Sequence, residues 1–516
     1  MNAPARTGSG RGRRRSPRLR SIQTLPQLPW RQVTNPYPPM QLASEEQLQA
    51  IHNTSMRILR ELGIELVNDR ALKLFAEAGA EVDWPAKTVR IDEALVNKAL
   101  ATAPASVTIT PRNPDKTIIV GGNHLNFSLV AGPPNVHDAV NGRRSGNYQD
   151  YCDFVRLAQH FNAIHLLGNQ VVAPIEMPAN NRHLDTYNAN LTYSDLSFMA
   201  SAIGRGRTLD AISMMGITKG LSLEEMRNNP ALMTIISINS PRKIDDAMAD
   251  GLMAMAEYGQ VNVITPFTLM GAMTPVSLPA ALAQQNAEAL FGITLTQLVN
   301  PGVPVVYGAY TSNVDMRSGA PAFGTPENTK ANIISGQLAR RYNLPYRCSP
   351  TNASNAADGQ SVYETEMALW SCILGHGNII YHAAGWLEGG LTASFEKFIL
   401  DVEMIQHLIE FLRPIEFNEA ELGFDAIKNV PTGGHFFGEA HTLERYETAF
   451  YEPLVSNWQN YENWQAGGGK TADERATDLW QEALKAYELP PMPADRREAL
   501  DAYIAKRKEA IGTGEP

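Results

Sequence analysis

Residues 271–310 read GAMTPVSLPAALAQQNAEALFGITLTQLVNPGVPVVYGAY, a stretch that holds a long helix followed by a strand. Ser277 is placed to cap the helix, and Pro279 lies in its first turn, where the missing N–H of proline costs no hydrogen bond. The Asn-Pro-Gly sequence at 300–302 ends the helix, and a short apolar run follows it. The stretch therefore predicts one step of an alternating β/α fold.

A second stretch repeats this order. Residues 377–412 read GNIIYHAAGWLEGGLTASFEKFILDVEMIQHLIEFL and begin with an apolar strand, which is followed by His382, Trp386 and Glu388. The helix after them has one apolar face, made by Phe395, Phe398, Ile399, Val402, Ile405, Ile409 and Leu412. Chemistry in repeated β/α units sits at the carboxyl ends of the strands, so residues there are candidates for a functional site.

The chain contains about eight strand candidates, the number that closes a (β/α)8 TIM barrel. They lie near Leu125–Val130, Leu166–Ala173, Phe198–Ile203, Met233–Ile238, Val261–Phe267, Pro304–Tyr307, Pro345–Cys348 and Asn378–His382. The third candidate also suits the end of the helix before it. We predict an α/β fold: a (β/α)8 TIM barrel with a small N-terminal α/β layer and a C-terminal helical cap.

Four parts of the chain are expected. Residues 1–40 are rich in arginine and proline and predict a disordered or extended basic arm. Residues 41–115 predict the N-terminal α/β layer, and residues 116–415 the barrel. Residues 416–516 contain an irregular aromatic region and two helices, which predict a C-terminal cap.

Two local signals refine this division. Ser44 and Gln47 have the spacing of a capping box and predict the start of the first helix. Asn141-Gly142 lies between polar residues after the first barrel strand and predicts a β-hairpin with a type I′ turn. We expect this hairpin to be an insertion at the barrel mouth.

Composition narrows the function classes. Of 516 residues, 44% are hydrophobic and 19% charged, which is typical of a globular enzyme with one large core. The net charge of −10 disfavours nucleic acid as a partner, because phosphate binding needs clustered lysine and arginine. No apolar run follows the arginines of residues 1–40 to make a secretory signal, so we expect a cytoplasmic protein with no membrane partner. The three cysteines are scattered, so neither a disulfide framework nor a thiolate zinc site is expected.

Five ordered segments form a long motif set. They are residues 271–308 quoted above, DMRSGAP at 315–321, QLARRYNLPYR at 337–347, HAAGWLEGGLTASFEKFILDVEM at 382–404 and GGHFFGEAHTLERYE at 433–447. Together they resemble the trimethylamine methyltransferase family, and the likeness covers most of residues 41–490. Enzymes of this family are (β/α)8 barrels that transfer a methyl group from an amine to the cobalt of a separate corrinoid protein. The resemblance implies this fold, this EC 2.1.1 type of activity, and cob(I)alamin or another corrinoid carried by a partner protein.

One departure from the family pattern concerns the substrate. The archaeal trimethylamine enzymes carry pyrrolysine at the barrel mouth near the seventh strand, where this chain reads YRCSPTNA at 346–353. In this respect the chain is similar to the pyrrolysine-free branch, which includes a glycine betaine methyltransferase. A betaine is already quaternary and gives its methyl group directly to cobalt(I), so no protein nucleophile or base is implied. The resemblance therefore implies a quaternary amine substrate that is similar to glycine betaine.

The candidate site residues follow from this chemistry, and none is assigned as catalytic. A quaternary ammonium has no N–H to donate, so its recognition falls to aromatic faces, each worth about 0.5–2 kcal/mol. The aromatic candidates at strand ends are Phe267, Tyr307, Tyr310, Tyr346 and Trp386, any one of which also suits ordinary barrel packing. Arg347 is the candidate for a bidentate pair with a substrate carboxylate, and His382 for a further donor. The alternatives are a structural pair of Arg347 with Asp358 or Glu364, and a core role for His382.

Other readings stay open or are disfavoured. His435, Glu439 and His441 lack the spacing of a two-histidine helix motif, so no metal is expected there. The corrinoid-binding pattern D-x-H-x-x-G is absent, which favours a corrinoid that arrives on another protein. A Schiff-base or metal-dependent barrel enzyme is disfavoured because no lysine stands at the predicted strand ends. A non-catalytic quaternary-amine binding protein, a methyltransferase for another methylated amine, and assembly as a homo-oligomer all stay open.

Overall fold

The computed structural model describes residues 27–512, and the arginine-rich part of the predicted basic arm lies outside them. Residues 27–40 run along the barrel in extended form. Within them, β1 (Val33–Thr34) pairs antiparallel with the start of β7 (His124–Leu129). The Asn35 side chain donates a hydrogen bond of 2.9 Å to a carbonyl at the end of a barrel helix, so this segment is tied to the barrel.

A small α/β layer precedes the barrel. Its elements are α1 (Glu45–Arg57), η2 (Ile58–Leu62), β2 (Ile64–Leu66), α2 (Asp69–Glu77), β3 (Glu81–Asp83), β4 (Thr88–Arg90) and α3 (Glu93–Thr102). Ser44 and Gln47 form the predicted capping box at the start of α1. The sheet of this layer has the order β13-β2-β4-β3. Because β13 (Lys243–Ile244) comes from a barrel loop, it fastens the layer to the barrel.

Eight parallel strands close the barrel in the order β7-β10-β11-β12-β14-β15-β18-β19, and β19 pairs back onto β7. Besides β7, they are β10 (Leu166–Leu167), β11 (Ser197–Ala200), β12 (Met233–Ile238), β14 (Val261–Met270), β15 (Val305–Gly308), β18 (Tyr346–Cys348) and β19 (Ile379–Ala384). The prediction of a closed eight-stranded barrel is confirmed. The third candidate is a strand and not a helix end, since β11 pairs with β10 on one side and with β12 on the other.

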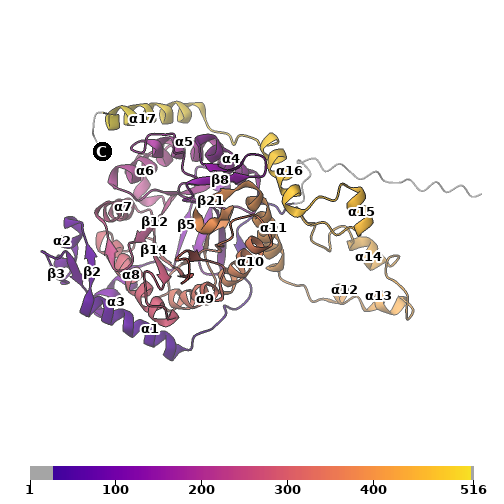
Figure 1. The fold of residues 1–516 in the computed structure, drawn as a ribbon, viewed down its shortest axis with the longest axis horizontal. Helices are drawn as coiled ribbons and strands as arrows, with labels where there is room; N and C mark the ends of the chain where they lie inside the picture. Colours follow the sequence, from indigo (N-terminus) through magenta and orange to yellow (C-terminus); the bar gives the residue numbers. More distant parts are fainter. Residues whose placement is uncertain (1–26, 513–516) are drawn as a thin grey trace, which may run out of the picture.

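Each barrel strand is followed by a helix, and the helices form an outer ring (Figure 1). They are α4 (Tyr148–His160), α5 (Arg182–Tyr193), α6 (Arg205–Lys219), α7 (Asp246–Glu257), α8 (Leu278–Val299), α9 (Pro326–Arg341), α10 (Gly359–Leu374) and α11 (Phe395–Phe411). A hairpin of β5 (Ser106–Ile109) and β6 (Ile118–Gly121) packs its apolar residues against the start of the barrel strands, including Met233 and Val263. This end of the barrel is therefore filled, and the carboxyl end of the strands is left for a site.

The β-hairpin predicted after the first barrel strand is present, but its turn differs from the prediction. β8 (Asn135–Asp138) pairs with β9 (Gly142–Ser145) so that Asp138 lies opposite Gly142, and the loop is residues 139–141. The expectation of a two-residue type I′ turn at Asn141-Gly142 was therefore wrong. The Asp138 carboxylate accepts the backbone N–H groups of the loop, which stabilises the longer turn, and Gly142 has a φ of 70°.

Short strands extend the sheet around the barrel mouth. β20 (Trp386–Leu387) and β21 (Thr392–Ser394) join β8 and β9 in a sheet of order β20-β21-β8-β9. β16 (Tyr310–Val314) pairs in parallel with the second half of β14, and β17 (Pro321–Ala322) pairs antiparallel with β16. These strands bring the loops after β15 and β19 toward the same opening.

After α11 the chain leaves the barrel and then returns to it. Residues 413–452, called the projecting arm below, contain no buried residue and carry α12 (Glu419–Leu422), α13 (Phe424–Asn429) and α14 (Ala440–Arg445). Figure 1 shows these helices extending away from the ring. The chain returns where the backbone N–H of Leu454 donates a 2.7 Å hydrogen bond to Glu403 of α11.

The last helices lie against the helical ring. α15 (Tyr461–Ala466) is followed by α16 (Ala472–Lys485), which packs on α11 and α4, and by α17 (Ala494–Gly512), which packs on α6 and α5. The division of the chain into an arm, a layer, a barrel and a cap at the proposed boundaries remains a prediction. Among residues 27–512, none of the helices combines the length and apolar character needed to cross a membrane.

Candidate substrate site at the barrel mouth

A cavity of about 690 Å³ opens at the carboxyl ends of the barrel strands. Its wall combines aromatic side chains with one arginine and one histidine: Phe267, Tyr310, Phe323, Arg347, Tyr381, His382 and Trp386. Five of the seven predicted site residues, Phe267, Tyr310, Arg347, His382 and Trp386, are thus brought together from four different strand ends. A large apolar pocket with a few converging polar groups is the usual form of a small-molecule site.

Arg347 is a buried charge that has no counter-ion within residues 27–512. It lies in β18 with 1% of its surface exposed, and its Nη1 donates a 3.1 Å hydrogen bond to the carbonyl of Ala309. Its Nε has no hydrogen-bond partner among the described residues. The guanidinium carbon lies 5.2 Å from the ring centroid of Tyr310 and 5.0 Å from that of Tyr381. Burial lowers the pKa of Arg347, but an arginine keeps its charge at neutral pH. The site therefore holds a positive charge that a bound anion would neutralise.

The structural pair considered for Arg347 is not formed. Asp358 caps α10 instead, because its carboxylate accepts the backbone N–H groups of Gln360 and Ser361. Glu364 accepts the backbone N–H of Ala353 at 2.9 Å. Both carboxylates are therefore committed to the loop after β18, and the guanidinium remains available to the cavity.

His382 owes its place in the cavity to an unusual backbone conformation. Its φ is 63°, and the pairing of β19 with β7 shifts register between Ile380 and Ala384. Side chains normally alternate along a strand, so the irregularity lets the neighbours Tyr381 and His382 both face the cavity. Burial and the charge of Arg347 lower the pKa of His382 well below its usual value, so its ring is neutral at pH 7.

Four aromatic rings stand close together in the cavity wall, and we call them the aromatic box: Phe267, Tyr310, Phe323 and Trp386. Tyr310 is central, with its ring centroid 5.0 Å from Phe267, 5.4 Å from Phe323 and 6.4 Å from Trp386. The indole N–H of Trp386 donates a 3.1 Å hydrogen bond to the carbonyl of Asn352, which fixes the ring. Because Tyr310 also contacts the Arg347 guanidinium, the box and the arginine are neighbours.

Tyr307 and Tyr346 do not line the cavity. The Tyr307 hydroxyl donates to the Asn286 side chain on α8 at 2.9 Å, and the Tyr346 hydroxyl donates to the carbonyl of Asn332 on α9 at 2.8 Å. Both rings therefore lie between the barrel and its helices. Side chains alternate between the two faces of a strand, so Tyr346, which precedes the inward-facing Arg347, must point outward.

Two wall residues were missed by the sequence analysis. Tyr381 lies next to a predicted residue, and its hydroxyl accepts the backbone N–H of Asn169 at 2.8 Å. Phe323 follows β17, and its ring reaches the site only because β17 folds back on β16. Regular alternation along β19 would have excluded Tyr381 once His382 was chosen, and nothing in the sequence near Phe323 marks it as a site residue.

A loop from β20 forms one side of the opening. Gly389 and Gly390 line the cavity, and a Cβ at Gly390 would lie 2.5 Å from the Trp386 ring. The carboxylate of Glu388 before them accepts a bifurcated hydrogen bond from the single N–H of Arg143 Nε, at 2.9 and 3.0 Å to its two oxygens. Arg143 belongs to β9, so the inserted hairpin holds the loop that positions the Trp386 ring.

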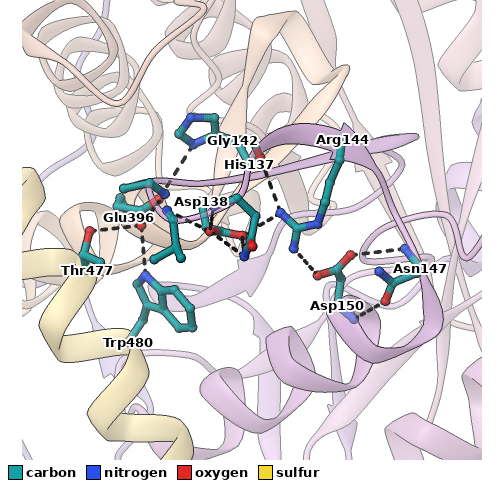
Figure 2. A network of polar contacts seen from close by, with 12 residues as sticks. His137, Asp138, Gly142, Arg144, Asn147, Asp150, Glu396, Thr477 and Trp480 are labelled. Carbon is teal, nitrogen blue, oxygen red and sulfur yellow. Dashed lines mark hydrogen bonds and ion pairs between the residues drawn. The ribbon is translucent and has the colours of Figure 1, made fainter.

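The hairpin is in turn held by the network in Figure 2. Arg144 bridges Asp138 of the hairpin and Asp150 of α4, with a distance of 2.6 Å to each carboxylate. Glu396 of α11 accepts a 3.0 Å hydrogen bond from the backbone N–H of Ala139 and a 2.9 Å bond from the indole of Trp480. Helices α4 and α11 thus fix the hairpin at the mouth, and α16 holds Glu396 through Trp480.

Other candidate chemistry is absent from the described part of the chain. No group of three or more metal-ligating side chains converges anywhere in residues 27–512. Cys152, Cys348 and Cys372 are all free thiols and buried. Lys397, the buried lysine of α11, forms an ion pair with Asp401, and the second oxygen of Asp401 accepts the N–H of Gly385.

The fold and the site define a class: a closed (β/α)8 barrel with a pocket at the carboxyl ends of its strands, lined by aromatic rings and a buried arginine. Comparison with known families identifies the group. A family model described as "Trimethylamine methyltransferase (MTTB)" matches residues 8–512, and the chain belongs to this family.

Individual relatives are similar over almost their whole length. A glycine betaine methyltransferase of Desulfitobacterium hafniense (strain Y51) is 35% identical over 476 residues, covering 92% of this chain and 98% of the relative. A proline betaine:corrinoid methyltransferase of Eubacterium limosum is 28% identical, with 89% and 96% covered. The crystal structure of the Methanosarcina barkeri monomethylamine methyltransferase (MtmB) aligns with a TM-score of 0.45 at 10% identity, covering 87% of this chain and 95% of that one.

Proposed function

We propose that the protein transfers a methyl group from a quaternary amine that carries a carboxylate, such as glycine betaine, to the cobalt(I) of a corrinoid held by a separate protein. The main support for this proposal is Arg347, a buried guanidinium beside an aromatic box that has no counter-ion in the described part of the chain. Family membership and the 35% identity to a glycine betaine methyltransferase support the same reaction.

The two parts of the wall match the two charges of a betaine. The rings of the aromatic box offer their faces to a quaternary ammonium, each with about 0.5–2 kcal/mol of cation–π attraction. The guanidinium of Arg347 offers a fork of donors to a carboxylate. Because Tyr310 contacts Arg347 and also belongs to the box, the two binding places are adjacent, which favours a substrate with few atoms between its charges.

The chemical step needs little from the chain itself. The electron pair of cobalt(I) forms the bond to the methyl carbon, and the N–CH3 electron pair returns to nitrogen to leave a neutral tertiary amine. Cobalt becomes formally cobalt(III), and no proton moves in this step. The chain's residues bind and orient the amine with one methyl group toward the opening, and the cavity wall excludes water. The corrinoid is a methyl acceptor brought by the partner.

A neutral His382 is consistent with a chain that binds and orients the amine but transfers no proton. A charged imidazolium beside the box would repel a quaternary ammonium, whereas burial and Arg347 keep the pKa of His382 low. Its Nδ1 lies 3.2 Å from the hydroxyl of Ser349, which orients the ring. His382 serves here as part of the wall and as a hydrogen-bonding group, and no base is required of it.

The role of Arg347 is tested by substrate pairs that differ in the carboxylate. Methyl transfer to reduced cobalamin is followed by its visible spectrum, with glycine betaine and with choline, a quaternary amine that has a hydroxyl in place of the carboxylate. In the wild type we expect kcat/KM for glycine betaine to exceed that for choline. In Arg347→Met we expect the glycine betaine value to fall roughly 30-fold or more, since an unpaired buried charge costs at least about 2 kcal/mol.

Arg347→Lys is the control, because it keeps the charge and loses the fork of donors, and its loss should be smaller. Equal selectivity for glycine betaine in the wild type and in Arg347→Met would contradict the assignment. Circular dichroism separates this outcome from misfolding. Binding of glycine betaine by a wild-type protein that transfers no methyl group would favour the binding-protein alternative.

A further inference from the structure

The projecting arm has an apolar surface that the other residues of the described range, 27–512, leave uncovered. Its side chains Phe417, Phe424, Phe437 and Phe450 are 67–82% exposed. No residue of α12, α13 or α14 is buried. Helices of four to six residues are marginal in water, because their stability normally comes from packing against another surface. The arm therefore needs a surface to pack against.

A second apolar area lies beside the root of the arm. Tyr363 and Met367, one turn apart on α10, are 64% and 48% exposed. One turn further along, the ring of Trp370 meets that of Phe411 at 4.9 Å, and Phe411 also contacts Tyr37 at 5.3 Å. We call these five residues the root patch. The outer face of a barrel helix is usually polar, so an apolar row there marks a contact surface.

We propose that the arm of one chain covers the root patch of a second copy, in a two-fold symmetric pair in which each chain gives and receives an arm. Patch and arm are continuous, because Phe411 ends α11 and the arm starts two residues later. A surface that contains both a projection and its receptor is self-complementary, as a two-fold interface requires.

The exposed apolar area is large enough for a stable pair. The arm alone has five phenylalanines, and a covered aromatic side chain buries about 150–250 Å². With the root patch this amounts to on the order of 1,000 Å² per chain. A stable interface buries about 800 Å² per partner, so the surface suffices for permanent assembly.

The position of the arm argues against the corrinoid partner as its occupant. Barrel helices run opposite to the strands, so α11 begins at the mouth and its last residue, Phe411, lies at the other end. The methyl acceptor must reach the mouth and leave after each transfer. The arm is rooted at that opposite end and needs a permanent cover, and a second copy of the same chain provides one.

The charge of the arm argues against a membrane surface. Residues 413–452 contain eight acidic and three basic residues. Anionic lipid headgroups attract basic segments and repel acidic ones, so this arm would be repelled by them. The acidic residues lie among the exposed rings, which is compatible with the mixed surface of a protein interface.

The test is the size of the particle in solution, measured by light scattering after gel filtration. The wild type should have at least twice the mass of one 56.6 kDa chain. Phe417→Asp combined with Phe424→Asp on the arm should release monomers, and so should Tyr363→Asp combined with Met367→Asp on the root patch. Leu489→Asp, at an equally exposed residue (60%) outside the arm and patch, is the matched control and should leave the mass unchanged.

Mixing the arm variant with the root-patch variant should restore a pair, because one intact arm then meets one intact patch. A monomeric wild type at tens of micromolar, or two variants that keep the wild-type mass, would overturn the proposal. Dissociation by the arm variant alone would put the arm on a different surface and overturn the root patch as its receptor. The two variants alter different elements of the chain. If one of them loses the wild-type circular dichroism spectrum, the mass of the other variant decides the test.

Discussion

At the scale of single residues, the site depends on a charge that is buried and not neutralised. Arg347 is held by one carbonyl and two aromatic rings, and its Nε has no partner among the described residues. Removing such a group from water costs several kcal/mol, which the fold recovers only when an anion completes the pair. A buried arginine of this kind costs stability, and the substrate carboxylate proposed above would explain why it lies there.

The aromatic box allows the cation–π contribution to be measured. We expect Trp386→Leu to raise KM for glycine betaine by roughly 5- to 30-fold, which corresponds to about 1–2 kcal/mol for the loss of one desolvated ring face. Tyr310→Phe keeps the ring and removes only a hydroxyl that donates to Thr351 at 3.4 Å, so its effect should stay within about threefold. The steady-state KM of both variants is the readout. If Trp386→Leu binds glycine betaine as well as the wild type does, the box is packing and not a cation site.

At the scale of secondary-structure elements, the inserted hairpin connects the cavity to the outer ring. It carries Arg143 to Glu388 next to the cavity, and it is held from behind by α4 and α11. The hairpin and its contacts therefore determine how firmly the loop of Gly389 and Gly390 is placed. This element links packing on the outside of the barrel to the shape of the site.

A pH dependence follows from His137 in this hairpin. Its Nδ1 lies 3.7 Å from the Glu396 carboxylate, and this ion pair raises the pKa of His137 above its usual value, against the opposing effect of burial. A histidine with a raised pKa stabilises the fold below its unfolded pKa of about 6.5, and this contribution is lost as pH rises through the folded pKa. The midpoint of thermal unfolding should therefore differ more between wild type and His137→Asn at pH 6 than at pH 8.5.

The control for this prediction is His435→Asn, on the projecting arm, which should change the unfolding midpoint by the same small amount at both pH values. A difference for His137→Asn that grows toward pH 8.5 would contradict the ion pair. Activity measured in parallel shows whether the loss of this contact also loosens the loop beside Trp386.

At the scale of the whole molecule, the strand order was predictable because it rests on short-range signals. Apolar runs bounded by Gly, Pro and Asn marked all eight barrel strands, and the helices between them fixed a parallel arrangement. The hairpin turn was not predictable from Asn141-Gly142, since the Asp138 carboxylate stabilises a longer loop. The projection of the arm was not predictable either, because its aromatic residues read as a packed cap.

The candidate site was predictable only in part for similar reasons. Position at a strand end selected Arg347, His382 and Trp386, but it also selected Tyr346, whose hydroxyl reaches the helix layer. Strand alternation would have corrected that choice. The left-handed backbone at His382 and the approach of Phe323 depend on tertiary contacts that no local pattern records.

The two ends of the barrel thus have separate proposed roles. The cavity and its aromatic box open at the carboxyl ends of the strands, and the arm leaves from the other end. A corrinoid protein would occupy the opening itself, whereas a second copy of the chain would lie on the outer helices α10 and α11. We therefore expect that mutations in the arm can abolish assembly without abolishing methyl transfer, and that mutations in the cavity can do the reverse.

The most direct test of the central claim is a single-turnover methyl balance with the purified protein and excess cob(I)alamin. With glycine betaine, we predict that methylcobalamin and dimethylglycine form in equal amounts. With trimethylamine, whose leaving group is poorer and which has no carboxylate for Arg347, we predict no methylcobalamin. Formation of methylcobalamin from trimethylamine, with none from glycine betaine or any other quaternary amine, would contradict the account.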